Sequence, residues 1–517
     1  ALVNETKGDV NHKEIRELWN NKDERLIKYA EKDALITLKL LRELRLIDKY
    51  IALSRASGAL LQDVINSGQT TMIDALLMRE YFKDNRVMPA KPIHDGSESD
   101  ENNYEGAIVI EPPKGLSEDV IILDFQSLYP SIVMAYNVSY DTLTDDESVE
   151  CNVSPTGARF VKSEIREGIL PKVLKRLFNE RLAAKSAMKS SDNELDKAYY
   201  DAKQYAMKIL LNSFYGYAGY TKGRLFTIEV AESVTAYGRQ NLLATKAFIE
   251  ESFGYEVIAG DTDSLFIKVD PNLELDQYKK IGDEIAAKVS ERLPHPMKLM
   301  FEAYAKRILF VAKKHYSMLK YEPNGATWKQ TIKTKGLETV RRDWCKLTSD
   351  TLEKVLDSVL VRGDVGEAIQ LCKICISDVL CDTFDVQDIQ LSRRYRGDGN
   401  GKVLTPHDNV ARKCKERGTK MFQEGDRVDF IIIKGGSSGV FSDQRITSEL
   451  LADKAEDPDY VRENNLEIDK DYYINNQIIP PVLRLLEPFG VTRDHLLGKV
   501  EYVGPKTIYA QKSIFSW

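Results

Sequence analysis

Three acidic residues, one of them far from the other two in the sequence, lie at the ends of apolar segments, where they could bind a metal ion. Asp124 follows four apolar residues, mostly β-branched, of the kind that form a strand buried on both faces. Asp261 and Asp263 lie in a Gly-Asp-Thr-Asp turn between two alternating apolar runs, which is typical of a β-hairpin. Strand-like alternation would place these two acids on one side of the hairpin and Thr262 on the other.

Carboxylates that lie close together either share a proton or bind a hard divalent cation, and ligand sets made only of oxygen favour Mg²⁺ or Mn²⁺ over Zn²⁺. Taken alone, Asp124 fits an N-cap or loop residue as well as a metal ligand. Because the hairpin supplies acidic partners, we predict that Asp124 and Asp263 bind metal and that Asp261 supports them.

The segment 163–220 predicts two helices joined by a polar tip, and it carries basic side chains at helical spacing. Residues three or four positions apart share one face of each helix: Arg181 and Lys185 on the first, and Lys208, Asn212 and Tyr215 on the second. An anion between the helices would therefore meet Arg181, Lys185 and Lys208 together. The alternative is a basic face exposed to solvent.

Three motifs connect these residues to a known family. Asp-Phe-Gln-Ser-Leu-Tyr-Pro-Ser-Ile begins at Asp124, Lys-x-x-x-Asn-Ser-x-Tyr-Gly begins at Lys208, and Gly-Asp-Thr-Asp-Ser begins at Gly260. Together and in this order they resemble the motifs of DNA polymerase family B, of the archaeal type, and the similarity runs over nearly the whole chain. The resemblance implies an α+β multidomain fold: a right-hand polymerase with an antiparallel-sheet palm, helical-hairpin fingers and a mostly helical thumb.

The resemblance also implies template-directed DNA synthesis, in which a dNTP is added to a primer 3′-hydroxyl with two Mg²⁺ ions, for which Mn²⁺ could substitute. The catalytic residues would be Asp124, Asp263 and Asp261, the first two as metal ligands. The nucleotide-binding residues would be Leu128, Tyr129, Arg181, Lys185, Lys208, Asn212 and Tyr215. Backbone amides at 128 and 129 would meet phosphate, Tyr129 would be the steric gate that excludes a 2′-hydroxyl, and Tyr215 would support the nascent base pair.

Contacts to primer–template DNA are implied for a further set of residues. They lie in a Tyr-x-Gly-Ala motif, a Lys-Lys-x-Tyr motif and the stretch that follows: Tyr104, Gly106, Lys313, Lys314, Tyr316, Lys335 and Arg341. Residues 301–346 carry eleven Lys or Arg against four acids, a local balance of +7 in a chain whose net charge is −7. We therefore expect a phosphate-facing surface there, and another on five Lys or Arg at 412–420 in the thumb.

The same resemblance implies the order of domains. Residues 1–50 would end an incomplete 3′-5′ exonuclease domain, 51–103 would be a helical linker, 104–162 and 221–345 the palm, 163–220 the fingers, and 346–517 the thumb. Tyr29 and Asp33 resemble the third motif of that nuclease, although they also fit an ordinary amphipathic helix. Its two earlier motifs are absent from the sequence, so we expect a carboxy-terminal portion that lacks an amino-terminal part and does not proofread by itself.

The last residues resemble the sliding-clamp box, in which a glutamine precedes an aliphatic and an aromatic residue: Gln511, Ile514 and Trp517. A sliding clamp is thus the expected protein partner. The alternative is a packed or frayed tail.

The composition limits the other possibilities. The sequence has no apolar run of about 18 residues and no signal peptide, so we expect no membrane partner and a cytoplasmic, nucleoid-associated protein. Cys372 and Cys375 lie in a helical pattern without a second pair and are interpreted as buried thiols. Two rival classes are an inactive DNA-binding scaffold, against which the intact acids argue, and a reverse transcriptase or RNA polymerase, against which Tyr129 argues.

Overall fold

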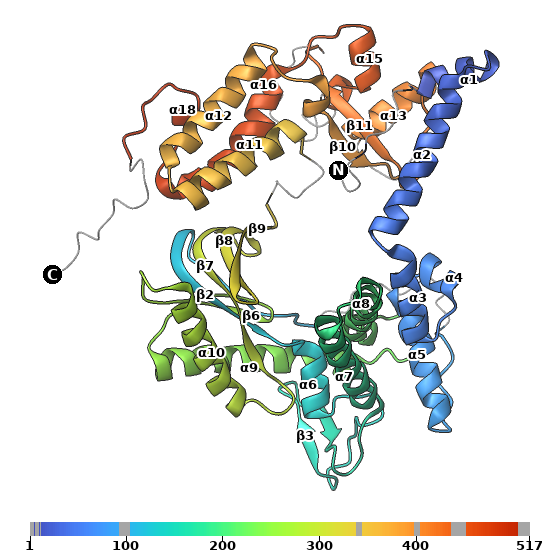
Figure 1. Cartoon of the computed structure of the whole chain (residues 1–517), viewed down its shortest axis with the longest axis vertical. Coiled ribbons are helices and arrows are strands. Elements are labelled where there is room, and N and C mark those ends of the chain that lie inside the picture. The colour runs from blue at the N-terminus through green and yellow to red at the C-terminus, as the bar shows by residue number, and fades with distance from the viewer. Residues whose placement is uncertain are drawn as a thin grey trace, which may run out of the picture. The chain divides into compact units, whose positions relative to one another are not determined.

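The computed structural model describes residues 12–92, 104–337, 344–397, 404–435 and 451–504, together with Glu5 and Val10. The chain divides into two compact units, and Figure 1 labels many of their elements. The first unit comprises Ala1–Val109, Leu123–Leu265 and Lys280–Phe301, and the second comprises Ile110–Ile122, Phe266–Lys279 and Glu302–Trp517.

A seven-stranded sheet has the order β1-β5-β6-β2-β7-β8-β9. Its strands are β1 (Val109–Ile110), β2 (Gly115–Phe125), β5 (Val257–Asp261), β6 (Ser264–Lys268), β7 (Leu299–Ala312), β8 (His315–Asn324) and β9 (Thr327–Lys335). The last three pair antiparallel, with Leu309 opposite Ser317 and Met318 opposite Lys333. The four apolar residues before Asp124 are at most 1% exposed in β2, as expected for a strand buried on both faces.

Helices dominate the first unit, including the segment 51–83, where the sequence predicts a helical linker. They are α1 (His12–Asn20), α2 (Glu24–Glu43), α3 (Leu46–Ser57), α4 (Leu61–Asn66), α5 (Gln69–Lys83), α6 (Leu128–Tyr136), α7 (Ile169–Ser190), α8 (Glu194–Ala218) and α9 (Ile228–Phe253). A short hairpin, β3 (Cys151–Val153) and β4 (Arg159–Val161), lies between α6 and α7, and α10 (Leu275–Arg292) follows β6. Within the described part of the chain, no helix is both long and apolar enough to cross a membrane.

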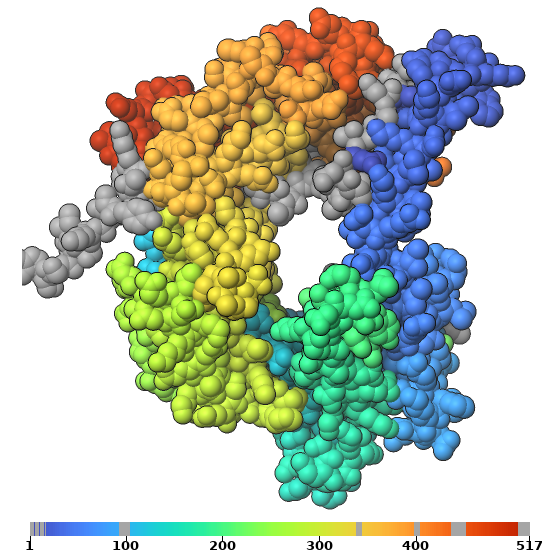
Figure 2. Space-filling view, viewed as in Figure 1, coloured from blue at the N-terminus to red at the C-terminus, as the bar shows by residue number. Residues whose placement is uncertain are grey.

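The helices α7 and α8 form the predicted helical hairpin. Asn193 caps α8 by accepting a hydrogen bond from the Leu195 N–H at 2.9 Å. The helix α3 packs along α8, where the Lys49 ammonium lies 5.3 Å from the centroid of the Tyr205 ring. In the space-filling view, the hairpin (green) and the helices α3–α5 (blue) meet along a continuous surface (Figure 2).

Polar contacts fix the base of this hairpin to α5. Glu80, which is 4% exposed, accepts hydrogen bonds from Arg176 Nη1 at 2.8 Å and Lys83 Nζ at 2.9 Å. Burial raises the pKa of Glu80, but these two cations outweigh it and leave that pKa below its usual value. Ser213 Oγ donates to Gln69 Oε1 at 2.7 Å. The helices that carry the predicted nucleotide contacts are therefore held at their bases.

Beyond residue 344, the second unit is mostly helical, as predicted for the thumb. Its elements are α11 (Lys346–Asp357), η2 (Ser358–Arg362), α12 (Val365–Leu380), η3 (Val386–Ile389), β10 (Leu391–Arg394), α13 (Pro406–Arg417), β11 (Arg427–Ile432), β12 (Ala455–Glu456), α15 (Pro458–Glu463), α16 (Lys470–Tyr472), η4 (Tyr473–Ile478), α17 (Ile479–Leu486), η5 (Glu487–Phe489) and α18 (Arg493–Leu496). Its strands form a sheet in the order β10-β11-β12. The sequence pattern does not predict this sheet, because its strands are short and separated by helices.

Cys372 and Cys375 lie on α12, and both are buried, as predicted. Burial raises the pKa of Cys372 to about 12 and that of Cys375 to about 11. Both thiols are therefore protonated at neutral pH and pack as small apolar groups in the thumb core.

Candidate active site

The end of β2 brings Asp124 next to the turn that carries Asp263. The N–H of Phe125 donates to the carbonyl oxygen of Asp263 at 2.8 Å, and β2 neighbours β6 in the sheet. Asp124 and Asp263 are partly exposed, whereas Asp261, the last residue of β5, is only 9% exposed. The structure therefore brings the backbone of Asp124 next to the turn that carries Asp261 and Asp263.

The turn between β5 and β6 differs from the predicted alternation. Thr262 has a left-handed backbone with φ +66°, and the N–H of Asp263 donates to the carbonyl oxygen of Asp261 at 2.8 Å. Asp263 is therefore a turn residue, and the twofold alternation of a strand does not reach it. The predicted hairpin is confirmed, but the reason given for the orientation of its acids is wrong.

The donors at this place suit a hard cation. Asp124 and Asp263 offer carboxylate oxygens, which are the preferred ligands of Mg²⁺ and Mn²⁺. Among the described residues, no group of three or more His, Cys, Asp or Glu side chains is arranged to hold an ion. Two aspartates fill only part of an octahedral shell, so oxygens of a phosphate ligand and water would have to complete it.

The amino end of α6 lies directly after β2. Ser127, with φ +53°, turns the chain from the strand into the helix. The N–H groups of Leu128 and Tyr129 lie in the first turn, where a helix provides no carbonyl partner and its dipole favours an anion. Arg181 Nη1 donates to Ser127 Oγ at 3.4 Å, so a cation of the α7–α8 hairpin lies beside this helix end. This arrangement supports the prediction that the two amides meet phosphate.

Three cations of the α7–α8 hairpin lie close enough to affect one another. Burial lowers the pKa of Arg181. Burial also lowers the pKa of Lys185, and the charges of Arg181 and Lys208 lower it further. An anion between such mutually repelling cations would stabilise all of them. Asn212 is exposed one turn beyond Lys208 on α8. That the three cations bind an anion together stays a prediction.

Tyr129 and Tyr215 form an aromatic pair. Their ring centroids are 4.6 Å apart and their planes are tilted by 43°. The hydroxyl oxygens of Tyr215 and Tyr104 are 3.1 Å apart, which links the pair to the predicted Tyr-x-Gly-Ala motif. Burial raises the pKa of Tyr129, and the negative charge of Asp263 raises it further, so this tyrosine lies within reach of the acidic turn. Burial and the hydrogen bond with Tyr104 also raise the pKa of Tyr215.

Two residues of α9, Gly238 and Arg239, lie beside Tyr129 and the Tyr104 segment, and no motif in the sequence points to them. Arg239 Nη1 donates to the carbonyl oxygens of Glu105 at 2.6 Å and Gly106 at 2.7 Å, which fixes the segment that follows Tyr104. At Gly238, a Cβ would lie 3.3 Å from Tyr129 Cε1, so a larger residue would press on that ring. The signal that could have revealed them is a Gly-Arg pair inside an otherwise helical pattern.

An open cavity of about 610 Å³ adjoins the tyrosines. It is lined by Tyr104, Gly106, Tyr215, Gly219, Tyr220, Thr221 and Lys222. Aromatic rings beside a lysine suit a planar ligand that carries negative charge.

In the second unit, Lys313 and Lys314 form the exposed two-residue turn between β7 and β8. Lys313 makes an exposed ion pair with Glu111 at 3.3 Å, which contributes little to stability. Gly336, with φ +68°, lies behind the turn, and a Cβ there would lie 2.3 Å from the carbonyl oxygen of Lys314. Only glycine therefore lets the chain pass so close to the turn.

Tyr316 belongs to the core of the sheet. It is 3% exposed, and its ring centroid lies 5.7 Å from those of Phe266 and Phe310. The ammonium of Lys335, an exposed residue, lies 5.6 Å from the centroid of the Tyr316 ring. Tyr316 thus supports Lys335 by packing beneath it, and the lysines are the groups that a ligand can reach.

Two of the cations at 301–346 are buried rather than exposed, so the predicted phosphate-facing surface includes fewer residues than expected. Arg307 is 0% exposed and Lys320 is 1% exposed. Lys320 Nζ lies 2.6 Å from Glu302 Oε1 and 2.8 Å from Glu322 Oε1. These cations serve internal contacts, so the surface is less positive than the local balance of +7 suggests.

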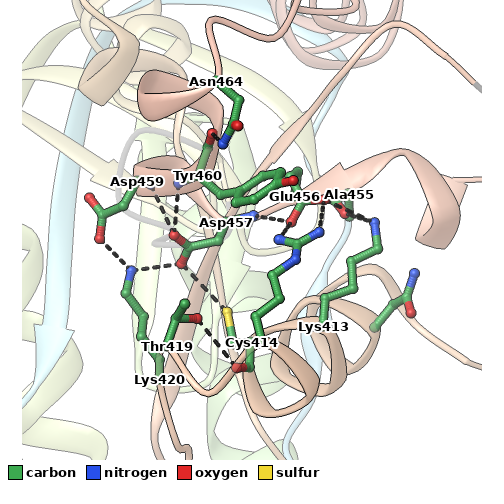
Figure 3. A network of polar contacts seen from close by, with 12 residues as sticks. Lys413, Cys414, Thr419, Lys420, Ala455, Glu456, Asp457, Asp459, Tyr460 and Asn464 are labelled. Carbon is green, nitrogen blue, oxygen red and sulfur yellow. Dashed lines mark hydrogen bonds and ion pairs between the residues drawn. The ribbon is translucent and has the colours of Figure 1, made fainter. Parts of the chain in front are cut away.

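Three of the five cations at 412–420 also form ion pairs with carboxylates (Figure 3). Arg417 donates to both carboxylate oxygens of Glu456, at 2.7 and 3.0 Å, and Lys413 Nζ lies 3.3 Å from the same carboxylate. Lys420 Nζ lies 2.6 Å from Asp457 Oδ2. Carboxylates about 40 residues further along the chain therefore compete with phosphate for these three cations, and their contact with DNA stays a prediction.

The other predicted site residues belong to the nuclease motif, the end of the palm and the tail. Tyr29 and Asp33 lie one turn apart on α2, and both are partly exposed. Arg341 and the tail residues Gln511, Ile514 and Trp517 lie outside the described residues.

Comparison with known proteins agrees with this fold. The family model described as DNA polymerase family B matches residues 59–489. The chain therefore belongs to DNA polymerase family B, and the predicted family and fold class are confirmed.

Named relatives include eukaryotic and archaeal proteins. A DNA polymerase delta catalytic subunit of Glycine max is 36% identical over 511 residues, which cover 94% of this chain and 45% of the relative. A DNA polymerase of Thermococcus gorgonarius is 34% identical over 518 residues, covering 98% of this chain and 64% of the relative. The solved family B DNA polymerase of Pyrobaculum calidifontis is 30% identical with a TM-score of 0.68, over 94% of this chain and 60% of that one. This chain thus spans about half to two thirds of the length of these relatives.

Proposed function

We propose that this chain catalyses template-directed DNA synthesis, adding deoxynucleotides to a primer 3′-hydroxyl. The observation that carries the proposal is that the acids of β2 and the hairpin, the amino end of α6 and the cations of α7 and α8 all belong to the first unit. Together they offer a metal site, an anion site and a cationic clamp for one triphosphate. The names of the similar proteins support the same reaction.

Asp124 and Asp263 would hold two Mg²⁺ ions, or Mn²⁺ in their place, with Asp261 in support. When bound, these ions lower the pKa of the primer 3′-hydroxyl and neutralise charge on the triphosphate. The donor chemistry fits, because aspartate and phosphate oxygens together can complete the shell of a hard cation.

The triphosphate meets the positive face of the α7–α8 hairpin. Arg181 supplies a bidentate fork, and Lys185 and Lys208 supply point charges that stabilise the leaving pyrophosphate. The N–H groups of Leu128 and Tyr129 bind phosphate oxygens at the end of α6, and Asn212 is an additional polar contact on the exposed face of α8.

The tyrosines select the sugar and hold the base pair. Tyr129 is the steric gate: its ring packs against Tyr215 and Gly238, so it has little freedom to move away from a 2′-hydroxyl. Tyr215, fixed by its hydrogen bond with Tyr104, supports the nascent base pair.

Primer–template DNA binds through exposed cations of the second unit. Lys313, Lys314 and Lys335 contact the duplex, with Arg341 as a further contact, while Tyr104 and Gly106 meet the template backbone. Binding to phosphates is sensitive to salt and independent of sequence.

The family resemblance further suggests the proposed domain order, with palm, fingers and thumb at the boundaries predicted above. Tyr29 and Asp33 supply only part of a two-metal nuclease site, so we do not expect this chain to proofread alone. We also propose that the tail at Gln511, Ile514 and Trp517 binds a sliding clamp. Deleting the last seven residues should abolish stimulation by the clamp and leave distributive synthesis intact.

The test is primer extension with Mg²⁺ by the Asp124→Ala variant. Losing a metal ligand removes several kcal/mol of charge stabilisation, so the rate should fall about a thousandfold or more while duplex binding persists. Asp270→Asn is the control, because Asp270 is an exposed acid just beyond β6 and its loss should leave extension unchanged. Retained extension by Asp124→Ala would refute the metal assignment. Comparing DNA with RNA templates, and deoxynucleotides with ribonucleotides, distinguishes the rival polymerase classes.

A further inference from the structure

Arg307 is a buried cation that has no part in the proposed chemistry. It lies on β7, is 0% exposed, and stands where the pairing register of β7 and β8 shifts between Ala305 and Arg307. A bulge of this kind redirects a side chain from the face that it would otherwise take. Burial of a guanidinium is strongly unfavourable without good partners, so its contacts indicate its role.

The hydrogen bonds of Arg307 join three elements of the second unit. Its Nε donates to Glu118 Oε1 on β2 at 3.0 Å, and its Nη1 donates to the carbonyl oxygens of Leu360 at 2.9 Å and Val361 at 3.2 Å. The two carbonyls belong to η2, a π-helical turn that continues α11 and ends at Gly363, which has φ +70°. Carbonyls at the end of a helix lack N–H partners within the helix, so the guanidinium supplies the donors.

Apolar side chains also pack between the strands β7 and β8 and the helix α11. Leu309 of β7 and Leu319 of β8 belong to one buried cluster with Leu352 and Val355 of α11. The strands and the thumb helices therefore share a core rather than meeting at a surface. The Lys313–Lys314 turn begins six residues beyond Arg307 on the same strand pair, and it belongs to the same compact unit.

We propose that Arg307 is a positioning residue for primer–template DNA. By fixing η2 to β7, it holds the thumb helices and the Lys313–Lys314 turn as one rigid surface, so that both engage the duplex at once. Without these hydrogen bonds only apolar packing would hold η2 to β7, and DNA binding would weaken because the surface is less rigidly preorganised. The inference rests on the proposed function, and it gives Arg307 no role in nucleotide addition itself.

The test compares three variants of the full chain. Arg307→Met removes the hydrogen bonds and the charge, and Arg307→Lys keeps the charge. The matched control is Arg362→Met, because Arg362 is an exposed arginine on the same η2 turn that pairs with Asp357 and Glu367. We expect Arg307→Met to release primer–template DNA roughly 2- to 30-fold faster into a competitor trap. It should also add fewer nucleotides per binding event, with an unchanged single-turnover rate in the preformed complex.

The DNA release rate and product length of Arg307→Lys should lie between those of Arg307→Met and of the unsubstituted chain. Arg362→Met should match the unsubstituted chain in both. A lower unfolding temperature with unchanged DNA release and product length would overturn the proposal, because the role of Arg307 would then be structural only. A slower single turnover with unchanged release would overturn it as well. If Arg307→Met does not fold, Arg307→Lys decides by the same criteria. DNA release is measured without nucleotides, so a chain that binds DNA but never extends primers would count against the proposed function alone.

Discussion

Replacing Gly336 with alanine should displace the Lys313–Lys314 turn, and Gly325→Ala is the matched control. Both glycines have left-handed backbones, with φ +68° and +64°, so alanine costs about 1 kcal/mol in backbone conformation at either position. Their surroundings differ. A Cβ at Gly325 would meet nothing within 4 Å, whereas one at Gly336 would lie 2.3 Å from the Lys314 carbonyl oxygen and 3.1 Å from His315 Cδ2.

The size of the clash sets the expected loss of stability. Ordinary van der Waals contact with a Cβ begins at 3.4 Å, so the Lys314 peptide has to move by about 1 Å. Forced packing of this kind adds roughly 1–3 kcal/mol. We therefore expect Gly336→Ala to lower the free energy of unfolding by roughly 2–4 kcal/mol, and Gly325→Ala by about 1 kcal/mol.

Chemical denaturation measures the stability difference, and DNA binding at several salt concentrations measures its consequence. Each lysine–phosphate contact adds about one unit to the slope of log K against log salt concentration, so displacing two lysines should weaken binding and reduce that slope by up to about 2. Gly325→Ala should bind DNA like the unsubstituted chain. Equal stability of the two variants would refute the steric reasoning. An unchanged slope in Gly336→Ala would refute the assignment of this turn to phosphate.

Two further predictions concern the gate and the thumb network. Tyr129→Ala should lower the ratio of kcat/KM for deoxynucleotides to that for ribonucleotides, on the order of 100-fold or more, and an unchanged ratio would remove its gate role. Burial raises the pKa of Glu456, but Arg417, the N–H of Asp457 and Lys413 outweigh it and hold that pKa below 4.5. The carboxylate therefore stabilises the fold above about pH 4.5, and its contribution is lost as the pH falls through the folded-state pKa. In Glu456→Gln, Tm should fall less steeply as the pH is lowered below about 4.5. Parallel curves of Tm against pH for the variant and the unsubstituted chain would contradict this.

The sequence predicted those parts of the site that depend on local pattern. The apolar run before Asp124 specifies a buried strand by itself, and the turn signals around Asp263 specify a hairpin. The helical spacing of Arg181 and Lys185 likewise needs no distant contact. The orientation of Asp263 was not predictable from strand alternation, because the left-handed Thr262 changes the direction of the chain within one residue.

These local sequence patterns could not predict contacts between segments that are distant in the sequence. The Tyr104–Tyr215 hydrogen bond joins residues 111 positions apart, and Arg239 reaches carbonyl groups more than 130 positions earlier. No periodicity relates such pairs, because their meeting depends on how α8 and α9 pack in the folded chain. A motif could indicate that Tyr104 matters, but only the fold identifies the arginine that fixes its segment.

Charge counting failed for a related reason. A local excess of lysine and arginine predicts a phosphate-binding surface only if the cations remain in solvent, and their acidic partners can come from anywhere in the chain. Lys413 and Arg417 are neutralised by an acid from β12, and Lys320 by acids on its own sheet. Lys313 and Lys314 differ from Lys320 in their exposure: they lie in the two-residue turn between β7 and β8 and remain exposed, although Lys313 pairs with Glu111 at 3.3 Å. The position of a cation within its element is therefore a better guide to phosphate contact than the net charge of its segment.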